Sequence, residues 1–413
     1  MKYYADLHIH SLYSRATSKD MNLDGIVKHA KLKGLHMIGT GDFTHPLWFA
    51  HLERNLEPKG DGVYHYKGID FMLTTEVSNI YSENGRVRKV HSLIILPDFK
   101  LVKEFSKELR KYGKLESDGR PTFGMSLKTL AKILFSIYPD AILIPAHAWT
   151  PWFSVFGSNS GFDSLEEAFG EYTEKIYAIE TGLSSDPPMN WMLSSLDRVV
   201  LISNSDAHSP QNLGREANCF SEPITYSSLL DILKNRDRKR FLYTIEFFPE
   251  EGKYHYDGHR KCGVRLDPEE SMKMRGLCPV CGKPLTIGVL HRVYQLADRK
   301  RGTVPEGAIP YKSLVPLREI MAEALGMGKG TSAVDKAYMK AISYFGDEFT
   351  ILLDVPIDEL RRGMDPRVVE GIRRVREGKL RIIPGYDGVY GTIRIFGDDE
   401  EEKKKEKRQL SLF

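Results

Sequence analysis

Short apolar runs alternate with helix-like segments over roughly the first 248 residues of the chain. The helix-like segments, such as residues 22–35, 99–113 and 126–139, carry apolar residues at helical spacing. This alternation predicts an α/β fold built on a parallel sheet, either open or closed into a barrel. The seven runs that we expect to be strands are KYYADLHIH, HMIGTGD, DFMLTTEVS, KVHSLIIL, AILIPAHAW, IYAIET and VVLISNSDAH.

The pattern changes after about residue 248. Residues 249–299 are rich in turn-forming residues, whereas residues 300–397 are mostly helical in pattern and end on the glycine-rich segment PGYDGVYGTIRIFG. The next eleven residues, DDEEEKKKEKR, are all charged, and we expect them to be disordered. Four parts are therefore predicted: a barrel over 1–248, a small domain over 249–299, a mostly helical domain over 300–397 and a tail over 398–413.

Composition narrows the class of protein only slightly. The chain is 41% hydrophobic and 28% charged with a net charge of +3, so any surface for nucleic acid must be local. No apolar run approaches the roughly 18 residues of a membrane span, and the N-terminus has no signal-peptide pattern. Three of the four cysteines cluster, which is typical of a metal site in a reducing compartment, and the fourth, Cys219, is expected to be a small buried residue. We therefore expect a cytoplasmic protein with no membrane partner.

Nearly every predicted strand ends on a side chain that can bind a metal ion. His8 and His10 stand two residues apart in the first strand, so their imidazoles project from the same face. Active-site residues of a parallel barrel lie at the carboxyl ends of its strands. His91 is a misfit, because it falls early in the fourth run. The set predicts a site for more than one metal ion, and its strand-end members are His8, His10, Asp42, Glu76, His147, Glu180, Asp206 and His208.

These residues give the first 248 positions a resemblance to the PHP (polymerase and histidinol phosphatase) family. The resemblance rests on the His-x-His-Ser start, the Ser-Asp-Ala-His end and the metal-binding side chains between them. It implies a distorted (β/α)7 barrel with two or three divalent metals. The matching residues are His8, His10, Ser11, Asp42, Glu76, His91, His147, Ser205, Asp206, Ala207 and His208.

A carboxylate can hold two cations closer together than imidazoles alone, so Glu76 is expected to bridge two metals. Two such metals activate water and clamp a phosphate during in-line displacement. Histidine-rich ligation favours Zn²⁺, with Mg²⁺ or Mn²⁺ as alternatives. The predicted ligand sets are His8, His10, Glu76 and Asp206 for one metal and Glu76, His91 and His147 for the other, with Asp42 supporting them from behind.

The chain departs from the common PHP pattern at two positions. Members with a third metal have an acid or a His where this chain has Arg15, and a His where it has Phe43. Both differences argue against a third metal. Arg15 is predicted to neutralise a substrate phosphate, with an ordinary exposed arginine as the alternative. With His208, Glu76 and Asp206 it completes the predicted catalytic set.

A second metal-binding pattern lies in residues 249–299. His259-x-x-Cys262 and Cys278-x-x-Cys281 have the spacing of a zinc ribbon with one His in place of a Cys. Each half is a tight knuckle, so four ligands can surround one Zn²⁺ with no open position, which predicts a structural zinc. His255 is the alternative fourth ligand, and three free thiols near a His are the alternative to a metal site.

The order of barrel, zinc ribbon, helical region and tail is similar to that of the endonuclease Q family. The segments KYHYDGHRKCGVRL, LCPVCGKPL and PGYDGVYG look especially close, and the resemblance covers essentially the whole chain. It implies a monomeric, nucleoid-associated DNA-repair endonuclease that cleaves 5′ to deaminated bases (hypoxanthine, uracil, xanthine) and abasic sites. The helical region would then bind DNA. A small-molecule phosphatase on the same barrel, or a non-catalytic module that tethers partners such as a clamp, are the alternatives.

An enzyme that inspects a damaged base must take it out of the stack into a pocket. The aromatic-rich insertion AWTPWFSVFGSNSGF follows His147 and offers rings to stack on a base or wedge into the gap. The segment ETGLSSDPPMNW follows the sixth strand and offers polar groups to read a base edge. Loop packing is the alternative for each residue. The candidates are Trp149, Trp152, Phe153 and Phe156 in the insertion, and Ser184, Ser185 and Asn190 in the second segment.

The chain ends on an apolar tip, QLSLF, beyond the charged tail. An apolar tip on a solvated tether favours a docking peptide that orders on its partner. Gln409, followed three residues later by Leu412 and then by Phe413, resembles the box that binds the sliding clamp PCNA. The usual box extends to a pair of aromatics, so the match is truncated. A fortuitous apolar terminus is the alternative.

Overall fold

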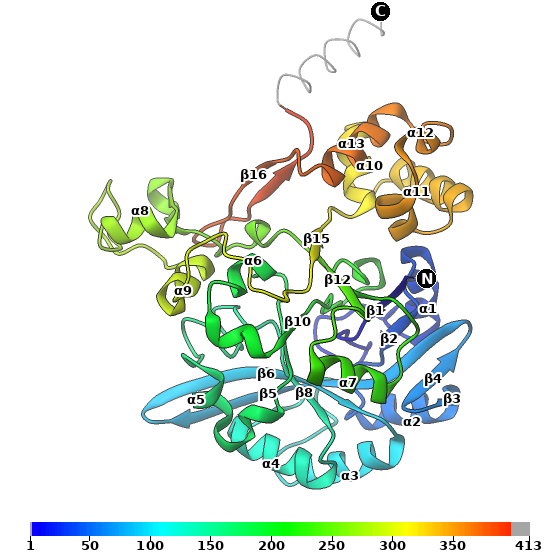
Figure 1. The fold of residues 1–413 in the computed structure, drawn as a ribbon, viewed down its shortest axis with the longest axis vertical. Helices are drawn as coiled ribbons and strands as arrows, with labels where there is room; N and C mark the ends of the chain where they lie inside the picture. The colour runs from blue at the N-terminus through cyan, green and yellow to red at the C-terminus, as the bar shows by residue number, and fades with distance from the viewer. Residues whose placement is uncertain (1, 398–413) are drawn as a thin grey trace, which may run out of the picture.

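A mixed parallel and antiparallel β-sheet, flanked by helices, forms the centre of the protein (Figure 1). The computed structural model describes residues 2–397, and one sheet contains most of its strands. The strands of the barrel region are β1 (Tyr3–Asp6), β2 (Met37–Gly39), β3 (Glu57–Gly60), β4 (Val63–Tyr66), β5 (Ile69–Glu83), β6 (Arg86–Leu96), β7 (Thr122–Phe123), β8 (Ile142–Pro145), β9 (Ala178–Glu180), β10 (Val200–Ile202), β11 (Ala217–Phe220) and β12 (Phe241–Glu246). A later strand, β15 (Tyr311–Ser313), completes the sheet at one edge, next to β12.

All seven predicted strands are present, but they are not all parallel. β1, β2 and β5 run parallel to one another, as do β9 and β10. β6 instead runs antiparallel to both β5 and β8, so the prediction of a parallel sheet is wrong for this strand. The reversal explains the misfit of His91. This residue pairs with Ser78, and Ser92 pairs with Pro145 at the end of β8, so the first half of β6 lies where its neighbours carry their functional side chains.

Among the described residues, the seven strands do not form one continuous hydrogen-bonded ladder. β9 and β10 form a separate pair. A single bridge between Ile9 and Ala207 joins the segment after β1 to the segment after β10. On the other side, Ala148 N donates to Glu180 O over 2.9 Å and joins the segment after β8 to β9. The functional segments that follow these strands are therefore drawn together by a few direct backbone contacts.

Helices connect the strands and cover the outside of the sheet (Figure 1). Those of the barrel region are α1 (Leu23–Lys33), α2 (Pro46–Asn55), α3 (Phe99–Leu109), α4 (Leu127–Ile137), α5 (Leu165–Phe169), α6 (Pro187–Asn190) and α7 (Tyr226–Asn235). Local signals set their ends. Asn22 accepts a hydrogen bond from Gly25 N at the start of α1, and Gly34 ends that helix at φ +87°, a conformation that favours glycine. Asp98 and Ser126 cap α3 and α4 in the same way, so the three helices predicted by spacing are also bounded by sequence signals.

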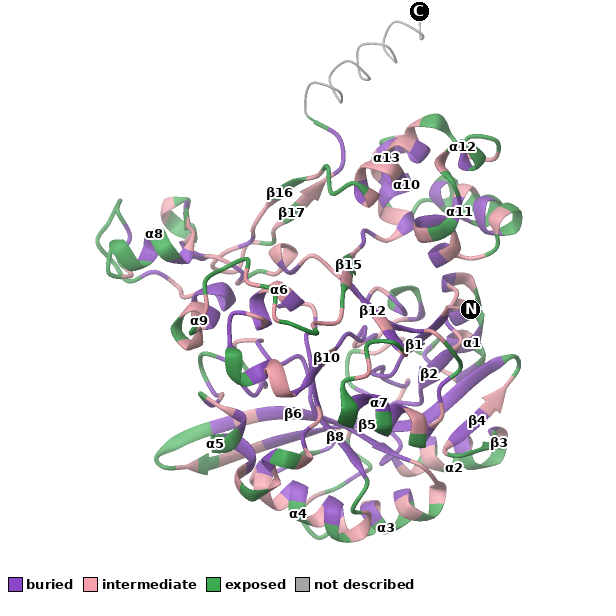
Figure 2. Cartoon of the chain, in the orientation of Figure 1, coloured by how far each residue is buried: buried purple, intermediate pink, exposed green. Residues whose placement is uncertain are grey.

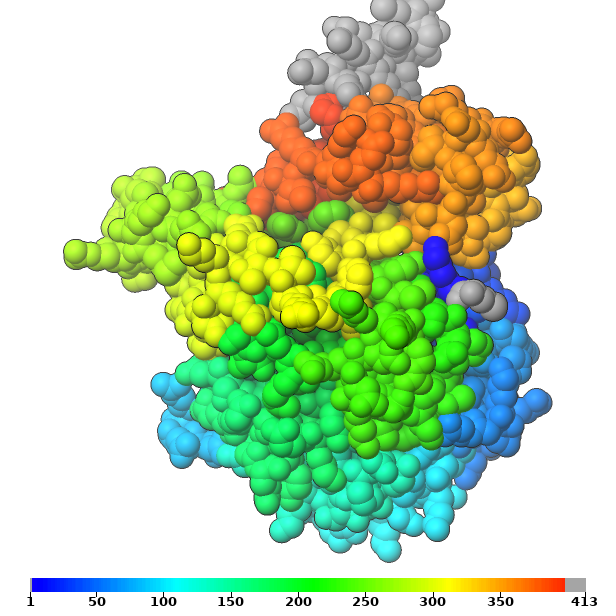
Figure 3. Space-filling view, in the orientation of Figure 1, coloured from blue at the N-terminus to red at the C-terminus, as the bar shows by residue number. Residues whose placement is uncertain are grey.

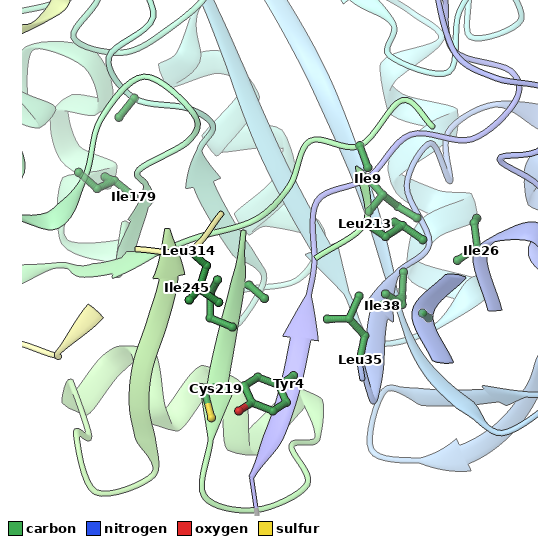
Figure 4. Packing of buried hydrophobic residues seen from close by; sticks show 14 of the residues in the cluster. Tyr4, Ile9, Ile26, Leu35, Ile38, Ile179, Leu213, Cys219, Ile245 and Leu314 are labelled. Carbon is green, nitrogen blue, oxygen red and sulfur yellow. The ribbon is translucent and has the colours of Figure 1, made fainter. Parts of the chain in front are cut away.

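The strands at the centre of the molecule are largely buried (Figure 2), and two layers of buried apolar side chains lie on opposite faces of β1. Tyr4 belongs to one layer, and Tyr3 and Ala5 belong to the other, as expected from the alternation of side chains along a strand. Figure 4 shows part of the first layer around Tyr4 and Ile38. Cys219 lies there opposite Tyr4 and is fully buried, as expected for a small apolar residue.

Part of the predicted zinc-ribbon region, residues 249–299, projects from the body of the molecule (lime green in Figure 3), and we call this region the projecting unit. Its elements are β13 (Asp257–His259), β14 (Val264–Leu266), α8 (Pro268–Lys273) and α9 (Val289–Leu296). β13 and β14 pair as an antiparallel hairpin. Arg292 in α9 donates to Phe156 O and Phe162 O, each over 3.1 Å, so this unit is held directly against the aromatic-rich insertion of the barrel.

The C-terminal part contains the predicted helices and ends on a hairpin. Its elements are α10 (Leu317–Leu325), α11 (Ser332–Phe345), a π-helical turn (Thr350–Asp354), α12 (Ile357–Leu360), α13 (Pro366–Arg376), β16 (Arg381–Ile383) and β17 (Thr392–Arg394). Residues 311–313 fall in a segment predicted to be helical, but they form β15, which pairs parallel with β12. Pro310 and Pro316 flank this strand and disfavour helix in the residues before them.

The helical part is fixed to the barrel at several points. Lys33 Nζ lies 2.9 Å from Glu348 Oε1, and both side chains are buried. The rings of Tyr4 and Phe349 lie 4.7 Å apart. No helix between residues 2 and 397 combines the length and apolar character that crossing a membrane needs. The predicted tail, with Gln409, Leu412 and Phe413, lies outside the described residues.

Candidate metal-dependent active site

Glu76 stands between two groups of side chains that can bind metal. On one side its Oε2 atom lies 3.2 Å from His10 Nε2 and 3.7 Å from His8 Nε2. Asp206 Oδ1 lies 3.0 Å from the same nitrogen of His10. The four ligand atoms all lie within 4.8 Å of one another. The structure thus brings the first predicted ligand set together just after β1, just after β10 and in the middle of β5. The prediction that Glu76 ends its strand is wrong, because β5 continues to Glu83.

The other oxygen of Glu76 faces the second predicted set. Oε1 lies 2.8 Å from His91 Nδ1 and 3.0 Å from His147 Nε2, and these two nitrogens lie 3.2 Å apart. Burial lowers the pKa of His91 to about 4, so its ring is neutral at pH 7, which is the form that binds a metal. Each oxygen of the Glu76 carboxylate therefore serves one group, as a bridging ligand would.

Several polar atoms in this cluster have no hydrogen-bond partner among the described residues. His8 Nε2, His10 Nε2 and Asp206 Oδ1 are buried and unpaired, although buried polar groups are nearly always satisfied. All three belong to the group around Glu76 Oε2. Unpaired imidazole and carboxylate atoms that converge on one point are the donor set of a divalent cation, so the residues fit a metal.

Carboxylates behind the cluster orient two of the imidazoles. His8 Nδ1 lies 3.0 Å from both oxygens of Glu180, and His10 Nδ1 lies 3.0 Å from Asp42 Oδ1. Asp42 also accepts hydrogen bonds from the backbone and hydroxyl of Ser11. A carboxylate on Nδ1 fixes the ring and directs Nε2 toward a metal. Asp42 thus lies behind His10, and Glu180 plays the equivalent part for His8.

Three residues of the site have backbone conformations that are uncommon for side chains larger than glycine. Their φ angles are +49° at Asp42, +32° at His147 and +46° at Asp206. Such angles cost energy and persist where the surrounding structure enforces them, often at functional sites. They occur within four residues after the ends of β2, β8 and β10, in the loops that present these side chains.

Arg120 is a functional candidate that the sequence analysis missed. Its Nη1 lies 3.1 Å from Glu76 Oε2, whereas the exposed Arg15 pairs instead with Asp118 at 3.4 Å. Burial acts to raise the pKa of Glu76, but the charges of His91, Arg120 and His8 hold it well below its usual range. Arg120 reaches the site because β7, two residues further on, pairs with β5 just after Glu76. A two-residue strand gives no periodic signal in the sequence.

Two solved structures resemble this chain along almost its whole length. The lesion-specific endonuclease PfuEndoQ from Pyrococcus furiosus matches with a TM-score of 0.86 and 35% identity, over 95% of both chains. Endonuclease Q in complex with a 27-mer duplex substrate, which has an abasic lesion at the active site, matches with a TM-score of 0.84 and 35% identity. That match covers 97% of this chain and 98% of the other. The chain belongs to the endonuclease Q family.

One sequence relative matches almost the whole chain, and another matches 60% of it. The uncharacterized protein YqxK of Bacillus subtilis is 30% identical over 412 residues, which is 95% of this chain and 99% of YqxK. The uncharacterized protein MJ0043 of Methanocaldococcus jannaschii is 35% identical over 254 residues, and the match spans only 31% of MJ0043. The family model described as the MJ0043 C-terminal domain matches residues 316–379, the region of α10 to α13.

The aromatic insertion that follows His147 contains both buried and exposed rings. Trp149 is fully buried, packs against Phe156 with ring centroids 4.9 Å apart, and donates to Asn190 Oδ1 over 2.7 Å. The prediction that Trp149 contacts a base is therefore wrong, because its ring belongs to the core. Trp152 is 45% exposed, and the ring of Phe153 lies 4.8 Å from that of His91. These two rings remain candidates for base contact.

The prediction for the segment after β9 is also partly wrong. Asn190 is buried and donates to Ser185 Oγ and Asp186 O, while Ser185 Oγ donates to Thr181 O. Their polar atoms are used inside the protein, so these two side chains do not fit the predicted role of reading a base edge. Ser184 is half-buried and keeps that role as a prediction.

The four predicted zinc ligands come together in the projecting unit. The ligand atoms of His259, Cys262, Cys278 and Cys281 all lie within 4.8 Å of one another. Burial opposes ionisation of Cys278, but backbone N–H groups of Cys281 and Val280, together with the His259 ring, lower its pKa to about 6. This favours the thiolate that zinc requires. His255, the alternative ligand, is buried and is not part of this group.

The two tryptophans of the insertion should respond differently to substitution. Trp149→Ala should lower the free energy of unfolding by about 3–5 kcal/mol, because it empties a large buried site. Trp152→Ala should change it by less than about 0.5 kcal/mol, because the ring is half-exposed. Urea unfolding followed by circular dichroism measures both. Equal losses in the two variants would contradict the assignment of Trp149 to the core.

Proposed function

We propose that the chain is a metal-dependent, lesion-specific DNA endonuclease. It hydrolyses the phosphodiester bond 5′ to deaminated bases (hypoxanthine, uracil, xanthine) and to abasic sites. The observation that carries this proposal is the Glu76 carboxylate shared between two groups of metal ligands. The family supports the substrate, since the chain is 35% identical to a lesion-specific endonuclease over 95% of its length.

The residues at the site would hold two divalent cations, Zn²⁺ by preference and Mg²⁺ or Mn²⁺ as alternatives. Bound there, two cations supply Lewis acidity, which activates water and neutralises charge on the phosphate. Arg120 lies beside Glu76 with its side chain 27% exposed, so its guanidinium can pair with a phosphate oxygen. We assign the neutralisation of substrate charge to Arg120, with Arg15 as a further contact at the exposed edge.

His208 is proposed to move a proton during the reaction. Its Nδ1 lies 2.9 Å from the carbonyl oxygen of Asp206, and a carbonyl only accepts, so Nδ1 carries the hydrogen. Burial lowers the pKa of His208, which keeps the ring neutral and leaves the Nε2 lone pair available. The ring is partly exposed and lies 4.4 Å from that of His10, at the edge of the metal cluster. His208 is therefore suited to accept a proton from water.

Recognition of the lesion is proposed to use base flipping. The damaged nucleotide would leave the stack and enter the site beside Trp152, Phe153 and Ser184. Unpairing costs least at an abasic site or a mismatched base, which favours damaged over intact DNA.

Cleavage of defined duplexes tests the proposed function. Four end-labelled duplexes, identical except for one uracil, hypoxanthine, abasic analogue or normal base, should be cut only at the lesion and on its 5′ side. The products should carry a 3′-hydroxyl, so a DNA polymerase should extend them directly. A 3′-phosphate, or equal cutting of the undamaged duplex, would contradict the proposal.

Comparing cleavage of these duplexes with hydrolysis of a phosphomonoester separates the two alternative functions. A small-molecule phosphatase should hydrolyse p-nitrophenyl phosphate and leave all four duplexes intact. A non-catalytic module should hydrolyse neither. The zinc ribbon and the helical part, which together cover residues 249–397, favour the nuclease, because a small-molecule phosphatase makes no use of them.

The tail is proposed to dock on the sliding clamp PCNA through Gln409, Leu412 and Phe413. A tether of this kind raises the local concentration of the nuclease on clamp-loaded DNA without fixing its orientation. Deletion of residues 409–413 should abolish stimulation by the clamp and leave cleavage without the clamp unchanged. Surface plasmon resonance on immobilised clamp measures the loss of binding directly. Undiminished binding by the truncated protein would place the contact elsewhere.

A further inference from the structure

Two exposed or half-exposed aromatic residues from distant parts of the chain lie side by side, and a third lies on the turn that contacts them. Trp152 is 45% exposed, and its ring centroid lies 5.9 Å from that of Tyr254. A Cβ atom on Gly388 would lie 3.8 Å from the hydroxyl of Tyr254. Two residues further on, Tyr390 is 69% exposed. We call Trp152, Tyr254 and Tyr390 the aromatic strip.

A rigid backbone holds this strip. The turn between β16 and β17 is bound to the segment before β13, with Gly388 N donating to Lys253 O over 3.0 Å and Tyr256 N donating to Gly385 O over 2.9 Å. A side chain at Gly385 or Gly391 would overlap carbonyl oxygens of that segment. The glycines of PGYDGVYG therefore allow two backbones to touch, and this contact fixes the position of Tyr390.

The strip begins at the metal cluster. The ring of Phe153 lies 4.8 Å from that of His91, and His91 N donates to Phe153 O over 3.1 Å. Trp152 is the next residue along the chain, and Tyr254 follows it in space. A nucleic acid strand with a phosphate at the metal cluster would thus continue over successive aromatic rings.

Cationic side chains accompany the rings. Lys253 Nζ lies 4.7 Å from the centre of the Tyr390 ring, and Arg260 Nη1 lies 3.6 Å from where a Cβ on Gly388 would be. Asp387 is the acidic residue of this turn, and it accepts hydrogen bonds from Arg260 N and Thr286 Oγ1. Nearby, burial raises the pKa of Glu251 to about 7, which reduces its negative charge at neutral pH.

We propose that the aromatic strip binds unstacked bases of the DNA strand next to the cleavage site, with Lys253 and Arg260 on its phosphates. This inference rests on the proposed function and extends its DNA contacts from Trp152 to Tyr254 and Tyr390. Aromatic rings interleaved with cations along a groove are the usual means of holding single-stranded nucleic acid, since every base has a face that stacks. The strip would hold the strand unstacked, so that the flipped nucleotide does not return to the helix.

Binding of an undamaged single strand tests the strip without requiring cleavage. A decathymidylate oligonucleotide should quench the tryptophan fluorescence of the intact protein. The Trp152→Phe variant should lose most of this quenching, because Trp48 and Trp149 are buried and the half-exposed Trp191 packs against Tyr311, outside the strip. Tyr390→Ala should raise the dissociation constant at least about fivefold, whereas Tyr390→Phe, which keeps the ring, should stay within about twofold. Lys253→Ala should reduce the salt dependence of binding.

Parallel measurements separate this inference from the proposed function. Tyr390 is exposed, so unchanged melting curves of the two variants would show that the fold is intact. If Tyr390→Ala and Tyr390→Phe bind the oligonucleotide equally while the wild type still cuts lesion duplexes, the strip is not a DNA contact. If the wild type cuts no lesion duplex but the quenching and its loss in Tyr390→Ala persist, the strip stands and the proposed function fails.

Discussion

Replacement of Asp206 by alanine should abolish cleavage of lesion-containing DNA, with a fall in rate of more than roughly a thousandfold. Loss of a residue that only supports a metal ligand typically costs 10–100-fold, so loss of a ligand should cost more. Asp206 Oδ1 is buried, unpaired and within reach of His10, which makes it part of the ligand group itself. Single-turnover cleavage of a uracil duplex measures the rate.

DNA binding should survive the same substitution, because it removes a negative charge from a site that receives a polyanion. Fluorescence anisotropy with a labelled duplex checks this. Asp140→Ala is a matched control, since Asp140 is exposed and its carboxylate forms a surface ion pair with Lys234. Its rate should stay within about twofold of wild type, as expected for a surface substitution. Activity of Asp206→Ala within tenfold of wild type would overturn the assignment of Asp206 as a ligand.

Replacement of Cys278 by serine should remove one zinc ion per chain and unfold the projecting unit locally. Cys278 packs in a small cluster with Val264 and Leu285, far fewer apolar contacts than the barrel has, so the metal would supply much of the stability. We expect rapid protease cleavage within residues 259–285 and weaker binding to DNA. Elemental analysis and limited proteolysis give the two readouts.

Cys219→Ala provides the matched control for the ribbon. It removes the one cysteine outside the ligand group, which lies buried in the barrel core. The zinc content should stay as in the wild type, and residues 259–285 should keep their resistance to protease. If Cys278→Ser lost a zinc ion but kept both protease resistance and DNA affinity, the ribbon zinc would be dispensable.

The strand-end residues were predictable because one rule relates strand direction to position. His8, His147 and Asp206 follow apolar runs, and the carboxyl ends of such runs meet at one edge of a parallel sheet. The rule fails for His91, since β6 runs in the opposite direction. The sequence of that run is as apolar as its neighbours, so only the pairing with β5 reveals its direction.

Residues with long-range roles were harder to predict. Arg120 reaches Glu76 through a two-residue strand, and Trp149 and Trp152 stand three positions apart in one insertion. Whether each ring faces the core or the solvent depends on Asn190 and Tyr254, which come from other segments. Composition and spacing identify the insertion as aromatic, but they do not fix the direction of individual side chains.

The helical part has little freedom to move relative to the catalytic barrel. The chain enters the helical part from β15, which is a strand of the barrel sheet. It leaves through the β16–β17 hairpin, which is hydrogen-bonded to the segment before β13. The buried ion pair of Lys33 and Glu348 attaches the helical part to the barrel at a third place. Under the proposed function, a helical part held at these three places cannot move to enclose a straight duplex. Any adjustment must then come from the DNA, so sequences that bend and unstack easily around a lesion should be cut faster than stiff A-tracts with the same lesion.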